Sequence, residues 1–202
     1  MRDGASGSEG RHDPRNPWRT VSSRRVYENP WMAVREDQVI RPDGRPGIYG
    51  VVETRVATGV VALTPALEVV LVGQWRYPLE RYSWEIVEGG ADPGEDPLEA
   101  ARRELREEAG LEAARWSDLG GELHLSNCIS SERGVLFLAE DLREVPAAPE
   151  GTEVLEVRRA PLGEVMGLLD RGELTDAVTV IALLRLERRL RAEGRWPGGA
   201  GA

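Results

Sequence analysis

The sequence has few of the residues that build disulfides, thiolate metal centres and lysine-based active sites. Its 202 residues include one cysteine, Cys128, two histidines and no lysine, so all 26 basic residues are arginines. A single cysteine excludes an intrachain disulfide and a zinc site made of cysteines. Two histidines disfavour a histidine-rich metal site. The absence of lysine excludes a phosphate-loop lysine and a Schiff-base lysine.

Basic charge and long apolar runs are also scarce. The net charge of -9 at pH 7 argues against nucleic acid as a partner, because binding its phosphates needs a basic surface. A small phosphorylated ligand stays compatible if a divalent cation lies between it and the protein. No apolar run reaches membrane-spanning length, and the N-terminus lacks the apolar core of a signal peptide. We therefore expect a cytoplasmic protein that does not bind membranes.

The residues that are present predict one main domain with polar ends. Apolar residues make up 41% of the chain, enough for a core. Residues 1–20 are rich in Gly, Ser, Arg, Asp and Pro and predict disorder, and residues 194–202 predict a flexible tail. Residues 21–57 contain short apolar segments broken by turn signals such as Pro42-Asp43-Gly44, which predict an N-terminal extension of strands. The main domain is expected at 58–193.

Within the main domain, strand-like and helix-like spacings of apolar residues are mixed. The Val-rich runs Val60–Leu63 and Leu67–Val72 flank Thr64-Pro65 and predict a central pair of strands. Asp96 as N-cap and Gly110 after the last turn delimit a first helix. Further strands are expected at Gly134–Ala139 and Glu153–Val157, and helices at Pro97–Gly110, Leu162–Leu169 and Thr175–Arg191. Elements mixed without strict βαβ alternation predict an α/β or α+β sandwich.

The helix expected at 97–110 carries three carboxylates close together, Glu104, Glu107 and Glu108. Like charges at this spacing repel one another on an isolated helix, so the alternatives are a solvated surface and a site for a cation. Because each helical residue turns by about 100°, the three carboxylates fill one arc beside the buried arc. Glu104 and Glu108 lie one turn apart and can bind the same hard cation, such as Mg²⁺, which prefers oxygen ligands.

A longer motif surrounds these carboxylates and decides between the alternatives. Gly89, Glu95, Arg103-Glu104-Leu105, Glu107-Glu108 and Gly110-Leu111 match the signature GX5EX7REUXEEXGU at every fixed position. The chain thus resembles a Nudix hydrolase. The resemblance implies an α/β/α sandwich around a mixed sheet, in which the signature forms a loop, a helix and a loop. It also implies hydrolysis of a nucleoside diphosphate linked to another moiety.

The resemblance also implies roles for residues of the signature. Mg²⁺ or Mn²⁺ would be held by the Glu104, Glu107 and Glu108 carboxylates and by the backbone carbonyl of Glu88. Arg103 and Glu95 would orient these ligands without taking part in the chemistry.

The residues before the signature resemble those of one branch of the family. Leu71–Pro78 and Trp84–Gly90 look like the segments "RQYRYP" and "WELPAG" of ADP-ribose and nucleoside diphosphate sugar pyrophosphatases. The resemblance implies that Arg76 and Glu85 contact the substrate and that Trp75 or Tyr77 stacks on its base. The alternative for such aromatic residues on a strand is a place in the core.

This branch has two further properties that the chain is expected to share. Its N-terminal strands cross to a partner subunit, which implies a homodimer in which Arg55 contacts the substrate across the interface. Its catalytic base is a glutamate on a loop after the signature, and here either Glu150 or Glu153 would be that base or an extra metal ligand. Spacing from the following strand favours Glu153, and an ordinary solvated loop acid is the alternative for each.

One departure from the branch bears on the substrate. ADP-ribose enzymes usually carry a proline after the signature, and Asn127 stands at that position in the segment Leu125–Glu132. Asparagine tolerates tight turns, so the loop can form, but its contact with the terminal sugar can differ. We expect a pyrophosphatase of ADP-ribose or a related nucleotide sugar. The alternatives are a preference for another sugar nucleotide such as GDP-mannose, and a non-catalytic Nudix domain that senses a nucleotide.

Overall fold

The computed structural model describes residues 13–147 and 154–197, which form two units, one ending at Glu53 and the other beginning at Thr54. The first unit is an antiparallel sheet in the order β1-β2-β3. Its strands are β1 (Arg19–Glu28), β2 (Met32–Ile40) and β3 (Pro46–Thr54). Disorder was expected up to residue 20, but β1 pairs with β2 from Arg19 onward, so that expectation is wrong at its last two residues.

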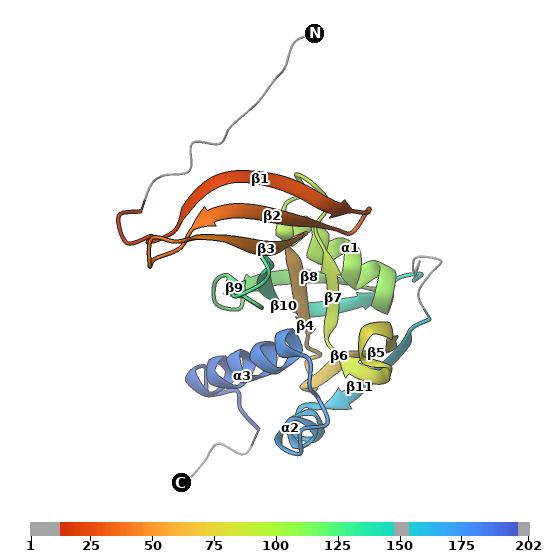
Figure 1. Ribbon diagram of the computed structural model, residues 1–202. Coiled ribbons are helices and arrows are strands. Elements are labelled where there is room, and N and C mark those ends of the chain that lie inside the picture. Colours follow the sequence, from red (N-terminus) through yellow and green to blue (C-terminus); the bar gives the residue numbers. More distant parts are fainter. Residues whose placement is uncertain (1–12, 148–153, 198–202) are drawn as a thin grey trace. The chain divides into compact units, whose positions relative to one another are not determined.

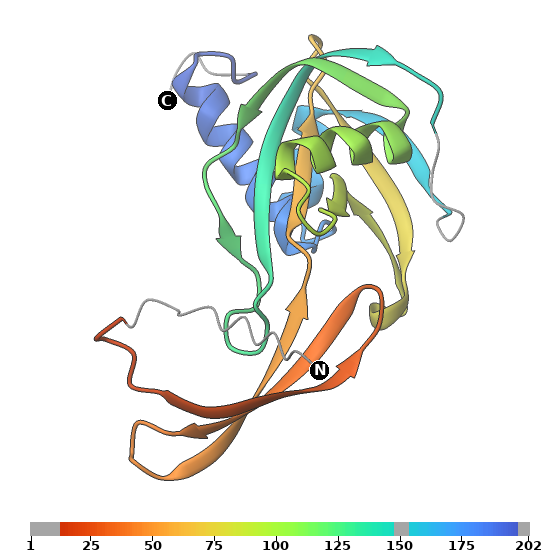
Figure 2. The same ribbon diagram turned by 90° about the horizontal axis from the view of Figure 1, so that it is seen from above.

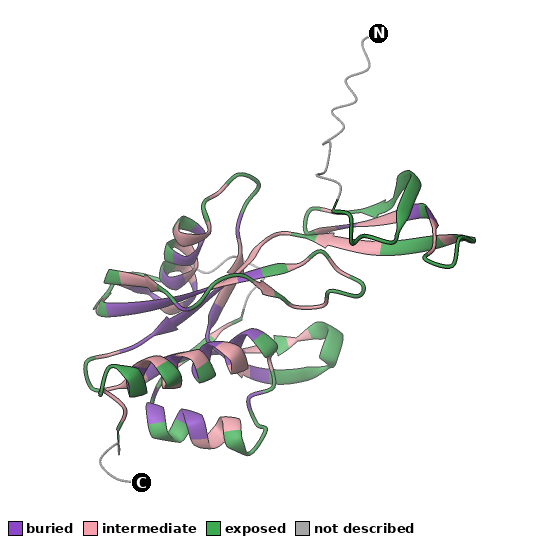
Figure 3. Ribbon diagram, turned by 90° about the vertical axis from the view of Figure 1, so that its left-hand side faces the viewer, coloured by how far each residue is buried: buried purple, intermediate pink, exposed green. Residues whose placement is uncertain are grey.

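The first unit has a defined turn and a thin core. The predicted turn is confirmed, because the Gly44 N–H donates to the Arg41 carbonyl at 2.9 Å and Gly44 has a φ of +80°, which favours glycine. Every residue of β1 is exposed (Figure 3). The exposed apolar side chains of this unit are those of Trp18, Val21, Val26, Tyr27, Trp31, Ile48 and Tyr49.

The second unit is built on a mixed sheet in the order β7-β4-β10-β8. β4 and β10 run parallel, side by side (Figure 2), and the other pairs are antiparallel. A second sheet has the order β11-β5-β6, and β9 pairs with β10. The strands are β4 (Ala57–Ala62), β5 (Glu68–Arg76), β6 (Arg81–Glu85), β7 (Val87–Gly90), β8 (Leu111–Asp118), β9 (Leu123–His124), β10 (Arg133–Glu144) and β11 (Glu156–Pro161).

The expected central pair of strands is wrong. The two Val-rich runs become β4 and β5, which belong to different sheets and meet only at an isolated bridge between Leu63 and Val69. The reason is that both edges of β4 are already paired, with Val60 opposite Val87 on one side and Phe137 on the other. β5 instead pairs with β6 and β11.

Helices cover the mixed sheet on both faces (Figure 1). Alternate residues of β4 point to opposite sides, so Val60 packs in one apolar cluster with Leu105 of α1 (Pro97–Ala109), and Val61 in another with Leu186 of α3 (Ala177–Ala192). This two-sided burial explains why β4 is almost continuously apolar. The α/β/α sandwich is therefore confirmed. The remaining helical elements are the short 3₁₀ helix η1 (Tyr77–Leu79) and the helix α2 (Leu162–Asp170).

The first helix begins and ends where the sequence predicts. The Asp96 carboxylate accepts hydrogen bonds from the N–H groups of Leu98 and Glu99, at 2.9 and 3.4 Å. Gly110 ends the helix with a φ of +61°. Across the two described stretches of the chain, every helix is too short or too polar to span a membrane.

Candidate active site

The signature glycine Gly89 lies at the end of β7, against the side chain of Glu104. A β-carbon built on Gly89 would lie 2.0 Å from the Glu104 Cδ atom and 2.1 Å from its Oε1 atom. Atoms cannot approach so closely, so only glycine lets the Glu104 carboxylate lie against this strand. β7 thereby comes into contact with the acidic face of α1.

Glu108 contacts the same strand one residue earlier. The residue is 5% exposed, and its Oε2 atom accepts a hydrogen bond from the backbone N–H of Glu88 at 3.2 Å. Glu104 and Glu108, one helical turn apart, therefore both lie against the Glu88–Gly89 peptide. The carbonyl of Gly89 in turn accepts a hydrogen bond from the Thr58 hydroxyl at 3.2 Å.

Arg103 connects the remaining acids of the signature. Its guanidinium donates to Glu95 at 3.2 and 3.1 Å, to Glu104 at 2.7 Å and to Glu107 at 3.0 Å. It also donates to the Gly90 carbonyl at 3.0 Å. The hydrogen bonds to Glu95 are the main reason why the pKa of Arg103 is raised, and Arg103 in turn lowers the pKa of Glu95. One guanidinium thus holds three carboxylates of the signature in place.

The side chain of Glu88 lies in a second acidic cluster that the sequence did not indicate. Its Oε1 atom accepts a hydrogen bond from the Thr179 hydroxyl at 2.9 Å. Burial, together with the Asp176 carboxyl and the charge of Glu85, raises the pKa of Glu88 well above its ordinary value. Thr179 is 91 positions away in the chain, so no local motif connects it with Glu88. The local pattern that could have drawn attention to this cluster is Asp176, an aspartate at the N-cap position of α3.

Arg76 and Glu85, both predicted to contact the substrate, bind each other. The Nε atom of Arg76 lies 3.0 Å from each Glu85 oxygen, and a second guanidinium nitrogen also contacts Glu85. Glu85 is buried, and Arg76 keeps 35% of its side chain exposed. Burial lowers the pKa of Arg76, but the hydrogen bonds and charge of Glu85, with the charges of Glu88 and Asp176, outweigh it and raise that pKa.

The two aromatic residues on either side of Arg76 lie outside the core. Trp75 is 60% exposed and Tyr77 is 85% exposed. The alternative that these aromatic residues fill the core is therefore wrong for both. Side chains on a strand alternate in direction, so Trp75 and Arg76 point to opposite faces at the end of β5.

The other predicted site residues have the following positions. Arg55 pairs with Asp92, in the loop before α1, with 2.8 Å between the Nη1 and Oδ1 atoms. Asn127 is exposed in the turn that the Ser130 N–H closes by donating to the Ser126 carbonyl at 2.9 Å. The two candidate bases, Glu150 and Glu153, lie outside the described residues.

A hard divalent cation needs several oxygen ligands close together. Within residues 13–147 and 154–197, no three Asp, Glu, His or Cys side chains are arranged to hold a metal. The donors themselves are carboxylate and carbonyl oxygens, which hard divalent cations prefer. The space that Gly89 leaves for Glu104 brings such oxygens together at the Glu88–Gly89 peptide, so the residues fit a hard cation in their chemistry.

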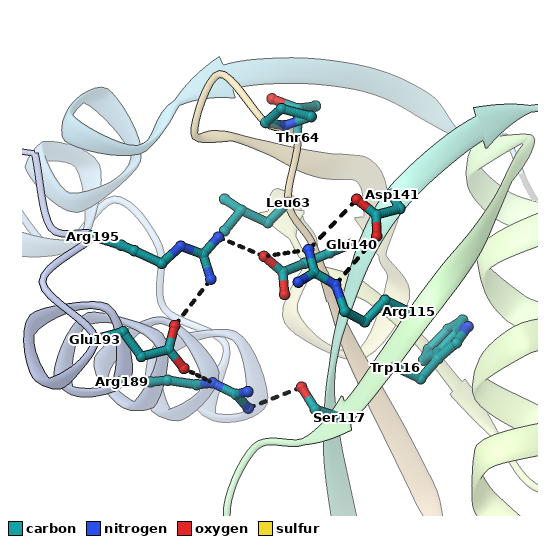
Figure 4. A pocket seen from close by; sticks show the side chains of 11 residues that line it. Leu63, Thr64, Arg115, Trp116, Ser117, Glu140, Asp141, Arg189, Glu193 and Arg195 are labelled. Atoms are coloured by element: carbon teal, nitrogen blue, oxygen red, sulfur yellow. Dashed lines mark hydrogen bonds and ion pairs between the residues drawn. The ribbon is translucent and has the colours of Figure 1, made fainter.

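A pocket of about 710 Å³ lies away from the signature, between β8, β10 and the end of α3 (Figure 4). Each of its three arginines pairs with an acid. Arg195 lies 2.6 Å from Glu140, Arg189 lies 2.8 Å from Glu193, and Arg115 lies 3.3 Å from Asp141. The Arg195–Glu140 pair ties the segment after α3 to the sheet, and the balanced charges give the pocket no net charge for an ionic ligand.

Comparisons with known proteins agree with this geometry. Residues 53–183 match the NUDIX domain, and residues 18–52 match the nucleoside diphosphate sugar hydrolase N-terminal domain. The chain belongs to the Nudix family and is a Nudix hydrolase, so the resemblance inferred from the signature is confirmed. Members of this family generally use a divalent metal.

Two relatives and one solved structure show the extent of the similarity. The chain is 33% identical to an ADP-ribose pyrophosphatase of Mycobacterium tuberculosis, covering 82% of this chain and 81% of the relative. It is 29% identical to an ADP-ribose pyrophosphatase of Bacillus subtilis, covering 87% and 96%. The crystal structure of an ADP compounds hydrolase matches with a TM-score of 0.78 at 25% identity, covering 89% of this chain and 97% of the other.

Proposed function

We propose that this Nudix hydrolase cleaves the pyrophosphate bond of ADP-ribose or a related nucleoside diphosphate sugar with the help of Mg²⁺ or Mn²⁺. The products are a nucleoside monophosphate and a sugar phosphate. The observation that carries the proposal is the meeting of Glu104 and Glu108 at the Glu88–Gly89 peptide. The match of the N-terminal strands to a nucleoside diphosphate sugar hydrolase domain supports this substrate class, as do the names of the relatives.

The metal would be held by oxygens of the signature and of β7. Glu104, Glu107 and Glu108 supply carboxylates, and Glu88 supplies its backbone carbonyl. When bound, the cation neutralises the diphosphate and lowers the pKa of the attacking water. Arg103 holds Glu104 and Glu107 in reach, and Glu95 holds Arg103.

The chain's own residues bind the substrate and move the proton. Arg76, with Glu85 behind it, binds a phosphate or the ribose, and Trp75 offers an exposed ring on which a base stacks. Glu153, or else Glu150, takes the proton from water as general base. The water oxygen then bonds to one phosphorus, and the bridging oxygen leaves with the other.

Asn127 favours a second candidate substrate. Because asparagine stands where ADP-ribose enzymes usually have proline, the exposed turn at Ser126–Ser130 can present a different surface to the terminal sugar. Another sugar nucleotide such as GDP-mannose is therefore the second candidate.

A substrate panel with Mg²⁺ or Mn²⁺ tests the proposal: ADP-ribose, ADP-glucose, GDP-mannose, UDP-glucose, NADH, diadenosine polyphosphates and oxidised dGTP. We expect the highest kcat/KM with ADP-ribose or another sugar nucleotide. Preference for oxidised dGTP would contradict the substrate class. No turnover of any compound would favour a nucleotide sensor.

We further propose that the strands of residues 21–57 join two copies of the chain into a homodimer. Tyr27 and Trp31 are 54% and 69% exposed. Exposed large apolar side chains gathered in one unit are typical of a protein–protein interface. Arg55 would then contact substrate bound mainly by the partner. Light scattering coupled to size-exclusion chromatography should give twice the mass of one chain, and a single-chain mass at micromolar concentration would contradict the dimer.

A further inference from the structure

The chain crosses from one sheet to the other immediately before the signature. β6 ends at Glu85 in the second sheet, and β7 begins at Val87 in the mixed sheet, so Ile86 alone joins them. The N–H of Ile86 donates to the Thr179 hydroxyl oxygen at 3.1 Å. Thr179 lies in the first turn of α3 and is fully buried. The helix thus holds the crossover through one side chain.

The same hydroxyl makes a second hydrogen bond, on the far side of Val87. It donates to the Oε1 atom of Glu88 at 2.9 Å. Thr179 is itself held in place, because its N–H donates to the Oδ2 atom of the N-cap residue Asp176 at 2.8 Å. One hydroxyl, anchored on a capped helix, therefore bridges the two residues on either side of Val87.

The bridge holds the side chain of Glu88, whose backbone also receives the signature carboxylates. Its N–H donates to Glu108, and the next residue, Gly89, lies against Glu104. A movement of this peptide would therefore move the Glu88 carbonyl and both carboxylates relative to one another.

We propose that Thr179 is a positioning residue of the active site, which sets the affinity for the divalent cation by holding the Glu88–Gly89 peptide against Glu104 and Glu108. The inference rests on the proposed function, in which these groups bind the metal. Thr179 touches neither metal nor substrate and acts through Glu88. Residues that orient metal ligands typically change metal affinity by 10- to 100-fold when they are mutated.

The role needs a hydroxyl, because the same oxygen accepts from Ile86 and donates to Glu88. Valine has nearly the same shape as threonine but can do neither, whereas serine can do both. Thr179→Val isolates the two hydrogen bonds, and Thr179→Ser restores them. Thr175→Val is a matched control, since Thr175 is an exposed threonine directly before the N-cap of the same helix.

The experiment measures Mn²⁺ binding to the full chain by electron paramagnetic resonance, without substrate. We expect Thr179→Val to raise the Mn²⁺ dissociation constant by about tenfold or more, and Thr179→Ser and Thr175→Val to stay near the wild type. In kinetics, Thr179→Val should raise the Mg²⁺ concentration needed for half-maximal activity, with kcat largely recovered at saturating Mg²⁺ and an unchanged KM for the substrate.

Glu88 is half-buried, and a carboxylate that loses its partner there is destabilising, so thermal unfolding is recorded for each variant. If Thr179→Val does not fold, the double variant Thr179→Val with Glu88→Gln removes the charge along with the hydroxyl, and it too should bind Mn²⁺ weakly. Wild-type Mn²⁺ affinity in a folded variant lacking the Thr179 hydroxyl would overturn the inference.

Glu108→Gln separates the inference from the proposed function. If it weakens Mn²⁺ binding while the variants lacking the Thr179 hydroxyl do not, the inference alone fails. If neither the wild type nor any variant binds Mn²⁺, both the metal site and the inference fail.

Discussion

Gly89 and Glu104 are packed so closely that a single methyl group on Gly89 would overlap the Glu104 carboxylate, 2.0 Å from its Cδ atom. Gly89→Ala should therefore displace Glu104 and lower kcat/KM by about a hundredfold, since a shift of about 1 Å in an active site can have such an effect. Gly90→Ala is the control, because its β-carbon would lie 3.4 Å from the nearest atom, Cδ of Arg55, an ordinary contact. Equal losses in both variants would contradict this explanation.

Glu104 and Glu108 should each be needed for hydrolysis. Glutamine keeps the size of the side chain but removes the charge that a cation requires. If each carboxylate contributes about 3 kcal/mol to a metal-stabilised transition state, Glu104→Gln and Glu108→Gln should each lower kcat by about a hundredfold. Steady-state kinetics over a range of Mg²⁺ concentrations measure the loss. Wild-type kcat in both variants would remove the basis of the proposed function.

Arg103 should be irreplaceable by lysine. Its planar guanidinium reaches Glu95, Glu104, Glu107 and the Gly90 carbonyl at once, which a single ammonium group cannot do. Arg103→Lys should lower the free energy of unfolding by about 2 kcal/mol, the scale of a hydrogen bond to a charged group, and should also lower kcat.

The neighbouring residue provides the control for that change. Arg102 is more exposed and pairs with Glu99 at the helix surface, 2.7 Å away. Arg102→Lys should change the urea unfolding curve little, because exposed pairs contribute about 0–1 kcal/mol. Similar losses of stability in the two lysine variants would contradict the prediction that the contacts of Arg103 stabilise the fold more than those of Arg102.

Glu88 should make the metal-free protein less stable as the pH rises. Burial and Asp176 raise the pKa of Glu88 above its ordinary value of 4.5. A carboxyl with a raised pKa binds its proton more tightly in the folded chain, so its contribution to stability is fully present below about pH 4.5 and is lost as the pH rises through the folded pKa.

Glu88→Gln removes this titration. As the pH rises above about 4.5, the free energy of unfolding should fall less in the variant than in the wild type. Urea unfolding in the presence of EDTA measures the difference, with Glu99→Gln as the control at an exposed position. Parallel pH curves for the wild type and Glu88→Gln would contradict the raised pKa.

Features that depend on residues close together in the chain were predictable. Asp96 and Gly110 determine the ends of α1 through caps within one helical turn, and the signature places Glu104 and Glu108 on one face. The turn at Gly44 needs only its own residues. The family followed from the same local spacing, because the signature is contiguous from Gly89 to Leu111.

Features that depend on which strands become neighbours were not predictable. Two Val-rich runs close in sequence looked like partners, but pairing depends on which edges are free, and the edges of β4 are taken by β7 and β10. The partnership of Arg76 with Glu85 likewise depends on the register of β5 and β6.

The sequence by itself determined the class of enzyme and the placement of the signature carboxylates on one helix face, because these are read from fixed spacings along one loop and one helix. Only the tertiary structure decided that Thr179 and Asp176 of α3 reach Glu88. The physical reason is that a hydrogen bond between residues so far apart in the chain forms only after the sheet and α3 have packed together, and no local pattern records that packing.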